Sequence, residues 1–336
     1  MMRAIRTIVG LILGLYLSVS YTQTNLNANQ QKQINTFINN MVAKHHYNRA
    51  HLVRLLRHAE FNAAVIATMT RPYEGRPWEV YRDFFITPKR IQQGVQFWLQ
   101  NQKALNQMQQ RYGVPPNVIV AILGIETNYG QVLGKYNTLN TLYTLAFNYP
   151  PRSKFFESEL EHFLLLCYEQ NLNPLTITGS YAGAIGLPQF MPSSYRFYAV
   201  DGDDSKHIDL VHDKADAIAS IANYLSKSGW QPNQLVAVRA RVRGWSYNQL
   251  AVNKLKPTIS IKELNKFGVR PIINLPPEQL ATFIRLQAEN APDYWLGLHN
   301  FYVISRYNPQ LSYTMVVYML SEEIKIAMAH NNRKYD

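Results

Sequence analysis

An apolar stretch from residue 115 to residue 125 that ends at a glutamate constrains this chain more than any other feature. The stretch contains no ionisable side chain, and Glu126 follows it directly. Its length and the proline at position 116 predict a buried helix that ends near the glutamate. Apolar neighbours withhold solvation from a carboxylate, and a helix C-terminus adds partial negative charge, so we expect a raised pKa for Glu126.

A carboxylic acid that keeps its proton near neutral pH can serve as the general acid in glycosidic bond cleavage. The residues after the stretch, 127–130, form a polar and aromatic turn (Thr-Asn-Tyr-Gly) of the kind that lines a cleft. The alternative is an ordinary helix-end carboxylate that points into water.

The composition predicts a folded protein with a large core. Hydrophobic residues make up 47% of the 336 positions and charged residues 17%, with 22 Tyr and 14 Phe. Low charge and high aromatic content exclude a largely disordered chain.

The first 20 residues are typical of a secretory signal. Arg3 and Arg6 precede an apolar segment over residues 8–19, and small residues at 18–20 suit cleavage. The apolar segment is short for a membrane span, which needs about 20 residues; an uncleaved anchor is the alternative. Without the two arginines, 32 basic and 22 acidic residues leave a charge of +10. This charge suits cell-wall polymers or membranes, whereas export argues against nucleic acid.

The single cysteine, Cys167, lies in a leucine-rich segment and cannot form an internal disulfide, so we predict a buried thiol without a role. An exported chain without disulfides of its own suits a bacterial envelope, and we expect the periplasm or cell envelope of a Gram-negative bacterium.

The pattern along the chain predicts a mainly α (α+β) protein. One helix is expected from Pro88 to a C-terminal cap at Gly113, with others near 116–126, 155–169, 216–226 and 312–329. Partial alternation over 235–242 and 258–261 predicts short strands. The expected domains are a signal peptide at 1–20, a tether at 21–33, a helical domain at 34–112, a core at 113–234, a small β-containing insertion at 235–300 and a C-terminal helical segment at 301–336.

Several segments have residue types that suit a sugar site. Residues 148–152 offer a tyrosine and Arg152, and Tyr307 and Tyr313 offer two more rings near the C-terminus. Aromatic faces stack on the apolar faces of pyranose rings. Core packing is the alternative for each of them. Residues 179–192 are dense in Gly, Ala and Pro, which permit close backbone approach to a ligand or between packed elements.

An acidic cluster at 201–216 resembles a calcium-binding loop. Oxygen side chains at alternate positions match the early ligands of such a loop, but Lys206 stands where a glycine is usual and His212 where a glutamate is usual. The alternative is a solvated acidic turn with Asp213 at the start of the next helix. The proposed ligands are Asp201, Asp203, Ser205, His207 and Asp216, for a structural Ca²⁺ that the chemistry itself does not require.

Taken together, four separated motifs resemble the membrane-bound lytic murein transglycosylase B family, which is glycoside hydrolase family 103. They are residues 124–127 (Gly-Ile-Glu-Thr), 147–150 (Phe-Asn-Tyr-Pro), 179–192 and 301–313. The resemblance implies a lysozyme-like α core with an added helical domain and a small β domain. It also implies cleavage of the β-1,4 bond between N-acetylmuramic acid and N-acetylglucosamine in peptidoglycan, without water, to give a 1,6-anhydromuramoyl end.

The resemblance also assigns roles to individual residues. Glu126 is the sole catalytic acid/base, Ser180 orients the muramoyl acetamido group, and Gln189 contacts the saccharide. Arg152 matches the second of two family arginines; the first is Pro151 here, and Asn128-Tyr129 replaces the Arg-Trp of some members. The tyrosines implied to line the cleft are Tyr81, Tyr224, Tyr307 and Tyr313.

The implied partners are peptidoglycan glycan strands and, as a further option, proteins of cell-wall synthesis, with membrane association only if the N-terminal segment is retained. A single carboxylate suffices if the sugar's own C6 hydroxyl is the nucleophile, and Glu157, Glu159 and Glu161 are expected on a solvated helix rather than at the site. Two alternatives stay open: a hydrolytic muramidase on the same scaffold, and a peptidoglycan-binding scaffold without turnover.

Overall fold

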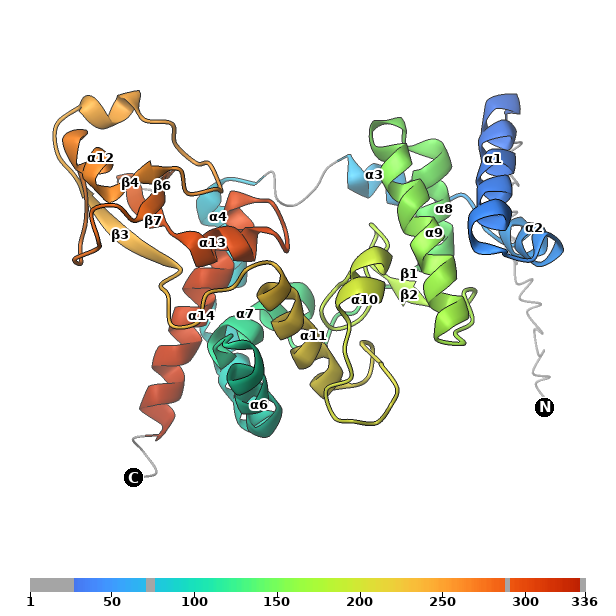
Figure 1. The fold of residues 1–336 in the computed structure, drawn as a ribbon, viewed down its shortest axis with the longest axis horizontal. Helices are drawn as coiled ribbons and strands as arrows, with labels where there is room; N and C mark the ends of the chain where they lie inside the picture. Colours follow the sequence, from blue (N-terminus) through green and yellow to red (C-terminus); the bar gives the residue numbers. More distant parts are fainter. Residues whose placement is uncertain (1–26, 71–75, 288–290, 333–336) are drawn as a thin grey trace, which may run out of the picture.

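The computed structural model describes residues 27–70, 76–287 and 291–332, and most of these residues are in helices (Figure 1). A small curved sheet accompanies the helices, so the predicted mainly α fold class is confirmed. The predicted signal at 1–20 lies outside the described residues. Within the described ranges, no helix combines the length and the apolar character that a membrane crossing requires.

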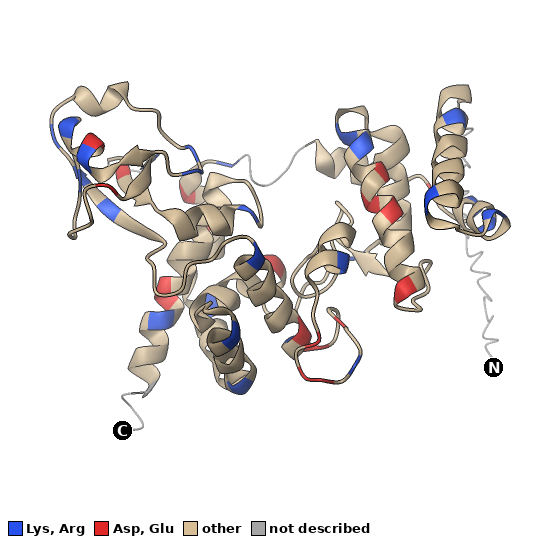
Figure 2. Ribbon diagram, in the orientation of Figure 1, with Lys and Arg blue, Asp and Glu red and all other residues tan. Residues whose placement is uncertain are grey.

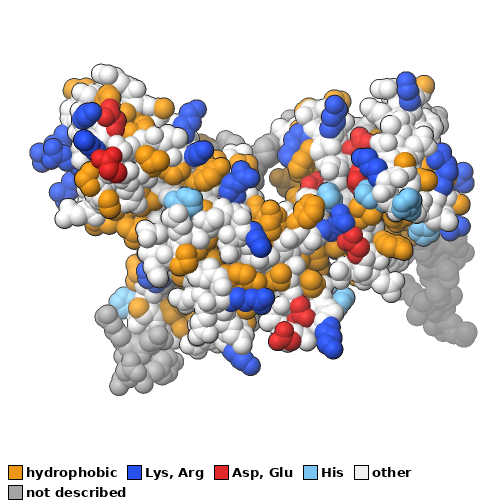
Figure 3. All heavy atoms as spheres, in the orientation of Figure 1, with side chains coloured by type: hydrophobic (Ala, Val, Ile, Leu, Met, Phe, Trp, Pro, Cys, Tyr) orange, Lys and Arg blue, Asp and Glu red, His pale blue; other side chains and the backbone are white. Residues whose placement is uncertain are grey.

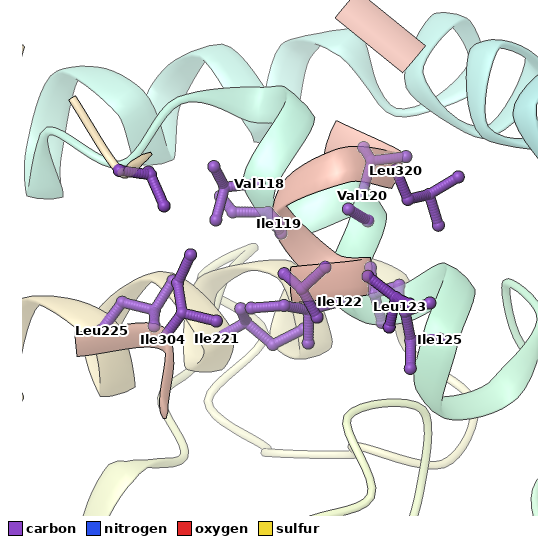
Figure 4. Close-up of a cluster of buried hydrophobic side chains, with 14 of the residues drawn as sticks. Val118, Ile119, Val120, Ile122, Leu123, Ile125, Ile221, Leu225, Ile304 and Leu320 are labelled. Atoms are coloured by element: carbon purple, nitrogen blue, oxygen red, sulfur yellow. The ribbon is translucent and has the colours of Figure 1, made fainter. Parts of the chain in front are cut away.

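One buried helix, α7 (Pro116–Thr127), is the centre of the main core. Every residue of α7 except Glu126 is buried, which confirms the helix predicted from the apolar stretch. Figure 4 shows Val118, Ile122 and Ile125 among side chains from α11, α13 and α14. The helices of this part are α4 (Trp78–Phe85), α5 (Pro88–Gln100), α6 (Gln102–Tyr112), α11 (Lys214–Lys227), α13 (His299–Ser305) and α14 (Leu311–Asn332).

A second core is formed by helices from two separate parts of the sequence. The elements around it are α1 (Ala28–His45), α2 (Arg49–Arg57), α3 (Ala63–Met69), α8 (Thr138–Asn148), the short 3-10 helix η2 (Pro150–Arg152), α9 (Ser153–Glu169) and α10 (Pro192–Tyr198). A two-stranded ribbon, β1 (Tyr136–Asn137) with β2 (Thr178–Gly179), lies beside them. Tyr224 and Tyr307 pack against both cores and so lie where the two meet.

The small sheet is antiparallel, with the strand order β4-β6-β7-β3-β5. Its elements are β3 (Ala237–Val242), η3 (Ser246–Gln249), β4 (Ile259–Ser260), α12 (Ile261–Lys266), β5 (Val269–Pro271), β6 (Leu280–Leu286) and β7 (Asp293–Gly297). One face carries a third core that includes Val238, Phe283 and Leu296, whereas Ile284 and Trp295 on the other face join the main core. The predicted strand at 235–242 is present as β3.

The structure differs from the sequence-based expectations in three ways. The helix predicted from 88 to 112 breaks at Asn101, whose side-chain amide donates to the Phe97 carbonyl and caps α5, so that α6 turns toward α11. Residues 28–33, predicted as tether, are the first turns of α1. Residues 34–112, expected as one helical domain, are divided between the two cores, because α1–α3 pack with α8 and α9 while α4–α6 pack with α7 and α14.

Two glycines allow α5 and α7 to approach the ring of Tyr129. A Cβ atom at Gly124 would lie 2.6 Å from the Tyr129 hydroxyl oxygen, and one at Gly94 would lie 2.7 Å from the same atom. We therefore expect Gly124→Ala to lower the free energy of unfolding by about 1–3 kcal/mol, because overpacking outweighs the gain in helix propensity. Urea denaturation measures this change. An unchanged or higher midpoint would show that the ring is not held between the two glycines.

Candidate functional site

Glu126 is the one residue of α7 that is not buried, and its side chain is half-exposed. It lies in the last turn of the helix, two residues before the C-cap residue Asn128, as the sequence predicted. The hydroxyl of Tyr313, on α14, donates a hydrogen bond to Oε1 of Glu126 over 2.6 Å. The carboxylate is therefore held against a buried phenol at the edge of the core.

The turn after Glu126 is fixed by an unusual backbone and by side-chain hydrogen bonds. Asn128 and Tyr129 have positive φ values of 49° and 60°. The Thr127 hydroxyl lies 3.1 Å from the Leu187 carbonyl oxygen, to which it donates, and accepts from the Gly130 amide at 3.0 Å. The turn is therefore connected to the Gly-rich segment.

Arg90 supports this turn from α5, and no pattern in the sequence pointed to this residue. Its Nη1 atom lies 2.9 Å from the carbonyl oxygens of both Phe84 and Phe85, and its Nε atom lies 3.5 Å from Oδ1 of Asn128. Burial lowers the pKa of Arg90. The Tyr129 hydroxyl donates to the Arg90 carbonyl over 2.8 Å. Asn128 and Tyr129 are 38 and 39 residues from Arg90 in sequence, so only the folded chain brings them together.

The Gly-rich segment approaches the same turn closely, as its composition predicted. A Cβ atom at Gly134 would lie 2.1 Å from the Gly179 carbonyl oxygen. Nε2 of Gln189 donates to the carbonyls of Leu133, at 3.2 Å, and Gly186, at 2.8 Å. Gln189 therefore uses both amide hydrogens within the protein, and its side-chain carbonyl oxygen accepts from no donor in the part of the chain that the structure describes.

Ser180 has the complementary arrangement. Its hydroxyl oxygen accepts from the backbone amides of Ala182, at 3.2 Å, and Ala184, at 3.0 Å. A serine hydroxyl has two acceptor sites and one donor. The donor has no acceptor among the residues described, so Ser180 presents a fixed O–H.

Tyr307 and Tyr313 stand side by side next to Glu126. Their rings are stacked, with centroids 6.4 Å apart and an interplanar angle of 9°. The Tyr307 hydroxyl donates to the Pro188 carbonyl over 2.5 Å. Burial, and then the charge of Glu126, raises the pKa of both phenols well above the ordinary value. Both hydroxyls therefore stay protonated and act as donors.

Tyr224 extends this aromatic row. Its ring lies 5.0 Å from Tyr307 and 5.7 Å from Phe190 between centroids, and its hydroxyl donates to the Arg306 carbonyl over 2.5 Å. Burial raises the pKa of Tyr224 to about 12. Four segments far apart in sequence, 126–134, 179–190, 224 and 307–313, thus converge on one site.

The other two candidate contacts differ in position. Tyr81, on α4, is buried and lies close enough to Tyr313 to help raise its pKa. Arg152 is exposed in η2, with its guanidinium 4.2 Å from the ring centroid of Phe155. No contact among the described residues links Arg152 to Glu126.

The expectation that Glu159 lies on a solvated face is wrong. Glu159 is 4% exposed, and its carboxylate accepts from the amide and hydroxyl of Ser193, at 2.9 and 2.7 Å. A carboxylate at a helix N-terminus satisfies free amides, and Ser193 is in the first turn of α10. Glu159 is therefore a structural cap within the second core.

The acidic loop brings carboxylates together. One oxygen each of Asp201, Asp203 and Asp216 all lie within 4.8 Å of one another. Oxygens bound to one Ca²⁺ at about 2.4 Å are at most about 5 Å apart, so the three fit a single ion. Asp216 is buried, accepts from the amides of Gly202 and Asp209, and has its pKa raised by burial.

The remaining loop residues are arranged around this cluster. The Ser205 hydroxyl donates to the His207 carbonyl over 2.9 Å, so these two candidate ligands are neighbours. Desolvation by itself would raise the pKa of Asp201. Hydrogen bonds from backbone amides, of which the amide of Lys206 contributes most, outweigh it and lower the pKa of this carboxyl. Asp213 accepts from the amides of Ala215 and Asp216 and caps α11, as the solvated-turn alternative also expected.

The side chain of Cys167 is buried, with 3% of the residue exposed, and burial raises the pKa of its thiol to about 12. The sequence-based prediction of a buried, unreactive cysteine agrees with this environment.

Comparison with known proteins identifies what this chain resembles. The family described as transglycosylase SLT domain matches residues 29–322. Membrane-bound lytic murein transglycosylase B of Escherichia coli K12 is 42% identical over 301 residues, which are 87% of this chain and 82% of that protein. The predicted family resemblance is confirmed.

Solved structures give the same result. The lytic transglycosylase Slt35 of Escherichia coli in complex with calcium has 42% identity and a TM-score of 0.82, and the match covers 88% of this chain and 94% of that one. SltB3 of Pseudomonas aeruginosa in complex with NAG-anhNAM-pentapeptide has 29% identity and a TM-score of 0.76, with coverage of 88% and 79%.

The hydroxyl of Tyr307 provides a test of the packing at this site. Tyr307→Phe leaves the Pro188 carbonyl without its donor, and we expect the free energy of unfolding to fall by about 1–3 kcal/mol. Urea denaturation measures the change, and Tyr168→Phe, at a ring that is 78% exposed, is the control with little expected effect. Equal midpoints for the two variants would contradict the role of this hydrogen bond.

Proposed function

Because this chain belongs to the transglycosylase SLT domain family, we propose that Glu126 is the sole acid/base of a reaction that leaves 1,6-anhydromuramoyl ends on peptidoglycan. The chain is a peptidoglycan lytic transglycosylase, as the sequence predicted. The observation that carries the assignment of Glu126 is its position: it is the one residue of a buried helix that reaches the surface, and it meets a buried phenol there.

The proposed reaction needs one carboxyl group. Protonated Glu126 gives its proton to the glycosidic oxygen as the bond to C1 of the muramoyl residue breaks. The carboxylate that results accepts the proton of the C6 hydroxyl of the same sugar, whose oxygen then closes onto C1. An internal nucleophile has a high effective concentration, so no second carboxylate is needed to activate water.

Tyr313 suits both halves of this cycle. Its phenol stays protonated because burial, and then the charge of Glu126, raises its pKa. A donor at 2.6 Å stabilises the carboxylate once the proton has left. We therefore assign Tyr313 the task of orienting Glu126 and holding its charge between the two proton transfers.

The substrate contacts follow from unused hydrogen-bonding capacity. The fixed O–H of Ser180 suits the carbonyl oxygen of an acetamido group, and the free side-chain carbonyl of Gln189 suits a sugar N–H or O–H. We propose that Tyr224 and Tyr307 form the aromatic wall of the cleft, with Tyr81 behind Tyr313. Arg152 is proposed as a contact for the carboxylates of a longer glycan or its peptide stem, because its guanidinium is exposed.

The complex of SltB3 with NAG-anhNAM-pentapeptide supports this product, because the fragment bound there contains an anhydro sugar. We propose that this chain likewise binds glycan strands with their peptide stems. The family places the chain in the cell envelope, and we propose the periplasm of a Gram-negative bacterium as its location. We also propose proteins of cell-wall synthesis as partners, which the activity itself does not require.

Glu126→Gln tests the assignment. We expect turnover of purified sacculi to fall below a few per cent, since a general acid contributes about 10²–10⁴-fold and the same group acts twice here. Release of soluble fragments measures turnover, while thermal unfolding and binding to sacculi should be unchanged. Glu323→Gln, at an exposed position on α14, is the matched control.

Mass spectrometry of the wild-type products separates the two reactions that the scaffold could carry out. Anhydro products are lighter by one water than the reducing ends that hydrolysis gives. Products with reducing ends would replace the proposal with a hydrolytic muramidase, and substantial turnover by Glu126→Gln would remove Glu126 from the chemistry.

We propose that the acidic loop binds a structural Ca²⁺, held by Asp201, Asp203 and Asp216, with Ser205 and the His207 carbonyl as further ligands. The three convergent carboxylates support this assignment, as does the calcium complex of the 42% identical Slt35. Bound calcium would supply charge neutralisation in the loop that precedes α11 and has no part in the bond cleavage.

Calcium removal tests this site. A ligand at 100 times its dissociation constant stabilises the native state by about 2.7 kcal/mol, so we expect millimolar Ca²⁺ to raise the melting temperature and a chelator to reverse the rise. Asp203→Asn should weaken the response. Asp204→Asn, in the same loop but outside the carboxylate cluster, should keep it. No response in the wild type would contradict the proposal.

A further inference from the structure

Four arginines form a stripe at the open edge of the small sheet. Arg239, Arg241 and Arg243 alternate along β3 and the residue after it, so their side chains share one face. Arg270, on the edge strand β5, pairs with Arg241. All four are exposed, and Lys and Arg gather at this end of the molecule (Figures 2 and 3). We call Arg239, Arg241, Arg243 and Arg270 the arginine stripe.

The charges of the stripe are largely uncompensated. Within residues 27–70, 76–287 and 291–332, no carboxylate pairs with Arg241, Arg243 or Arg270. Arg239 lies 3.5 Å from a carboxylate oxygen of Asp293, and its guanidinium is 4.9 Å from the ring centroid of Trp295. Like charges directly opposite one another destabilise a sheet. An anionic partner would therefore relieve the repulsion between Arg241 and Arg270.

Exposed apolar side chains border the stripe. Trp245 follows Arg243 by two residues and is 81% exposed, whereas Trp78, Trp230 and Trp295 are buried. Ile272, 51% exposed, donates its amide to the Arg239 carbonyl and therefore lies opposite Arg239 on the same face. Ile273, next to it, is 45% exposed.

We propose that the arginine stripe, together with Trp245, Ile272 and Ile273, is a docking surface for a bilayer that contains anionic phospholipids. Arginines meet lipid phosphates bidentately, and tryptophan is favoured at the level of the headgroups. Branched aliphatic side chains gain from the acyl region of a bilayer, whereas they offer neither hydrogen bonds nor a flat ring to a sugar. This combination favours a lipid surface over a glycan strand.

The surface is separate from the catalytic machinery. Glu126 is at the end of α7, whereas the stripe is on β3, on the residue after it and on the edge strand β5. Ile284 and Trp295, on the neighbouring strands β6 and β7, pack on the main core. An enzyme held at a membrane by this sheet would keep its aromatic row and Glu126 available to peptidoglycan. The proposal does not depend on the identity of the catalytic residue.

Vesicle binding of the full chain tests the proposal. We compare vesicles of phosphatidylglycerol and phosphatidylethanolamine with vesicles of phosphatidylcholine, for the wild type and for Arg241→Gln/Arg243→Gln/Arg270→Gln. Each basic residue near an anionic surface contributes about fivefold, so the triple variant should bind the anionic vesicles about 100-fold more weakly. Added salt should weaken wild-type binding. The residues before position 27 are common to all variants, so their contribution cancels.

Two controls make the result specific. Arg54→Gln/Arg57→Gln/Lys103→Gln removes the same charge from exposed positions outside the small sheet and should bind nearly as the wild type. Anionic vesicles should shift the tryptophan emission of the wild type to shorter wavelength, and Trp245→Phe should lose this shift. Both triple variants should keep wild-type activity on soluble glycan fragments.

Three results would overturn the proposal. The stripe variant could bind anionic vesicles as tightly as the wild type. Both triple variants could lose binding equally, which would assign it to net charge. The stripe variant could instead lose binding to purified sacculi while it keeps vesicle binding, which would make the stripe a glycan surface.

Discussion

The burial of every α7 residue except Glu126 holds the whole site in place. A helix whose other residues are all buried has one fixed position and rotation, so the direction in which Glu126 leaves it is fixed as well. The surrounding helices α5, α11 and α14 are packed against it, and α14 also supplies Tyr313. The same packing therefore stabilises the fold and aligns Glu126 with its phenol donor.

The rest of the site is held by side chains that donate to backbone carbonyls of other segments. Thr127 reaches Leu187, Gln189 reaches Leu133, and Tyr307 reaches Pro188. Buried carbonyls without a donor are costly, so each contact fixes the position of a loop as well as of a side chain. The Gly-rich segment is close enough for these bonds because its glycines leave room for neighbouring backbone. Rigid loops are thus obtained without regular secondary structure.

The two clusters of like charge in this protein are stabilised differently. In the acidic loop, backbone amides already donate to Asp201 and Asp216, and three carboxylates converge within the size of one cation. In the arginine stripe, Arg241 and Arg270 face each other across two strands without a carboxylate among the described residues. One cluster is a closed site for a small ion, whereas the other is an open surface that suits an extended anionic partner.

Local features could be predicted from the order of the residues: the buried helix that ends at Glu126, the cap at Gly113, the strand at β3 and the buried thiol of Cys167. Each depends on neighbours within a few residues, where periodicity and turn chemistry act. The break at Asn101, the burial of Glu159 against Ser193 and the support of the turn after Glu126 by Arg90 could be seen in the folded chain alone. Apart from the local cap at Asn101, these depend on contacts between residues 34 or more positions apart, and on which core each helix joins. The spacing of apolar residues predicts which face of a helix is buried, but it does not predict which other helix or strand packs on that face.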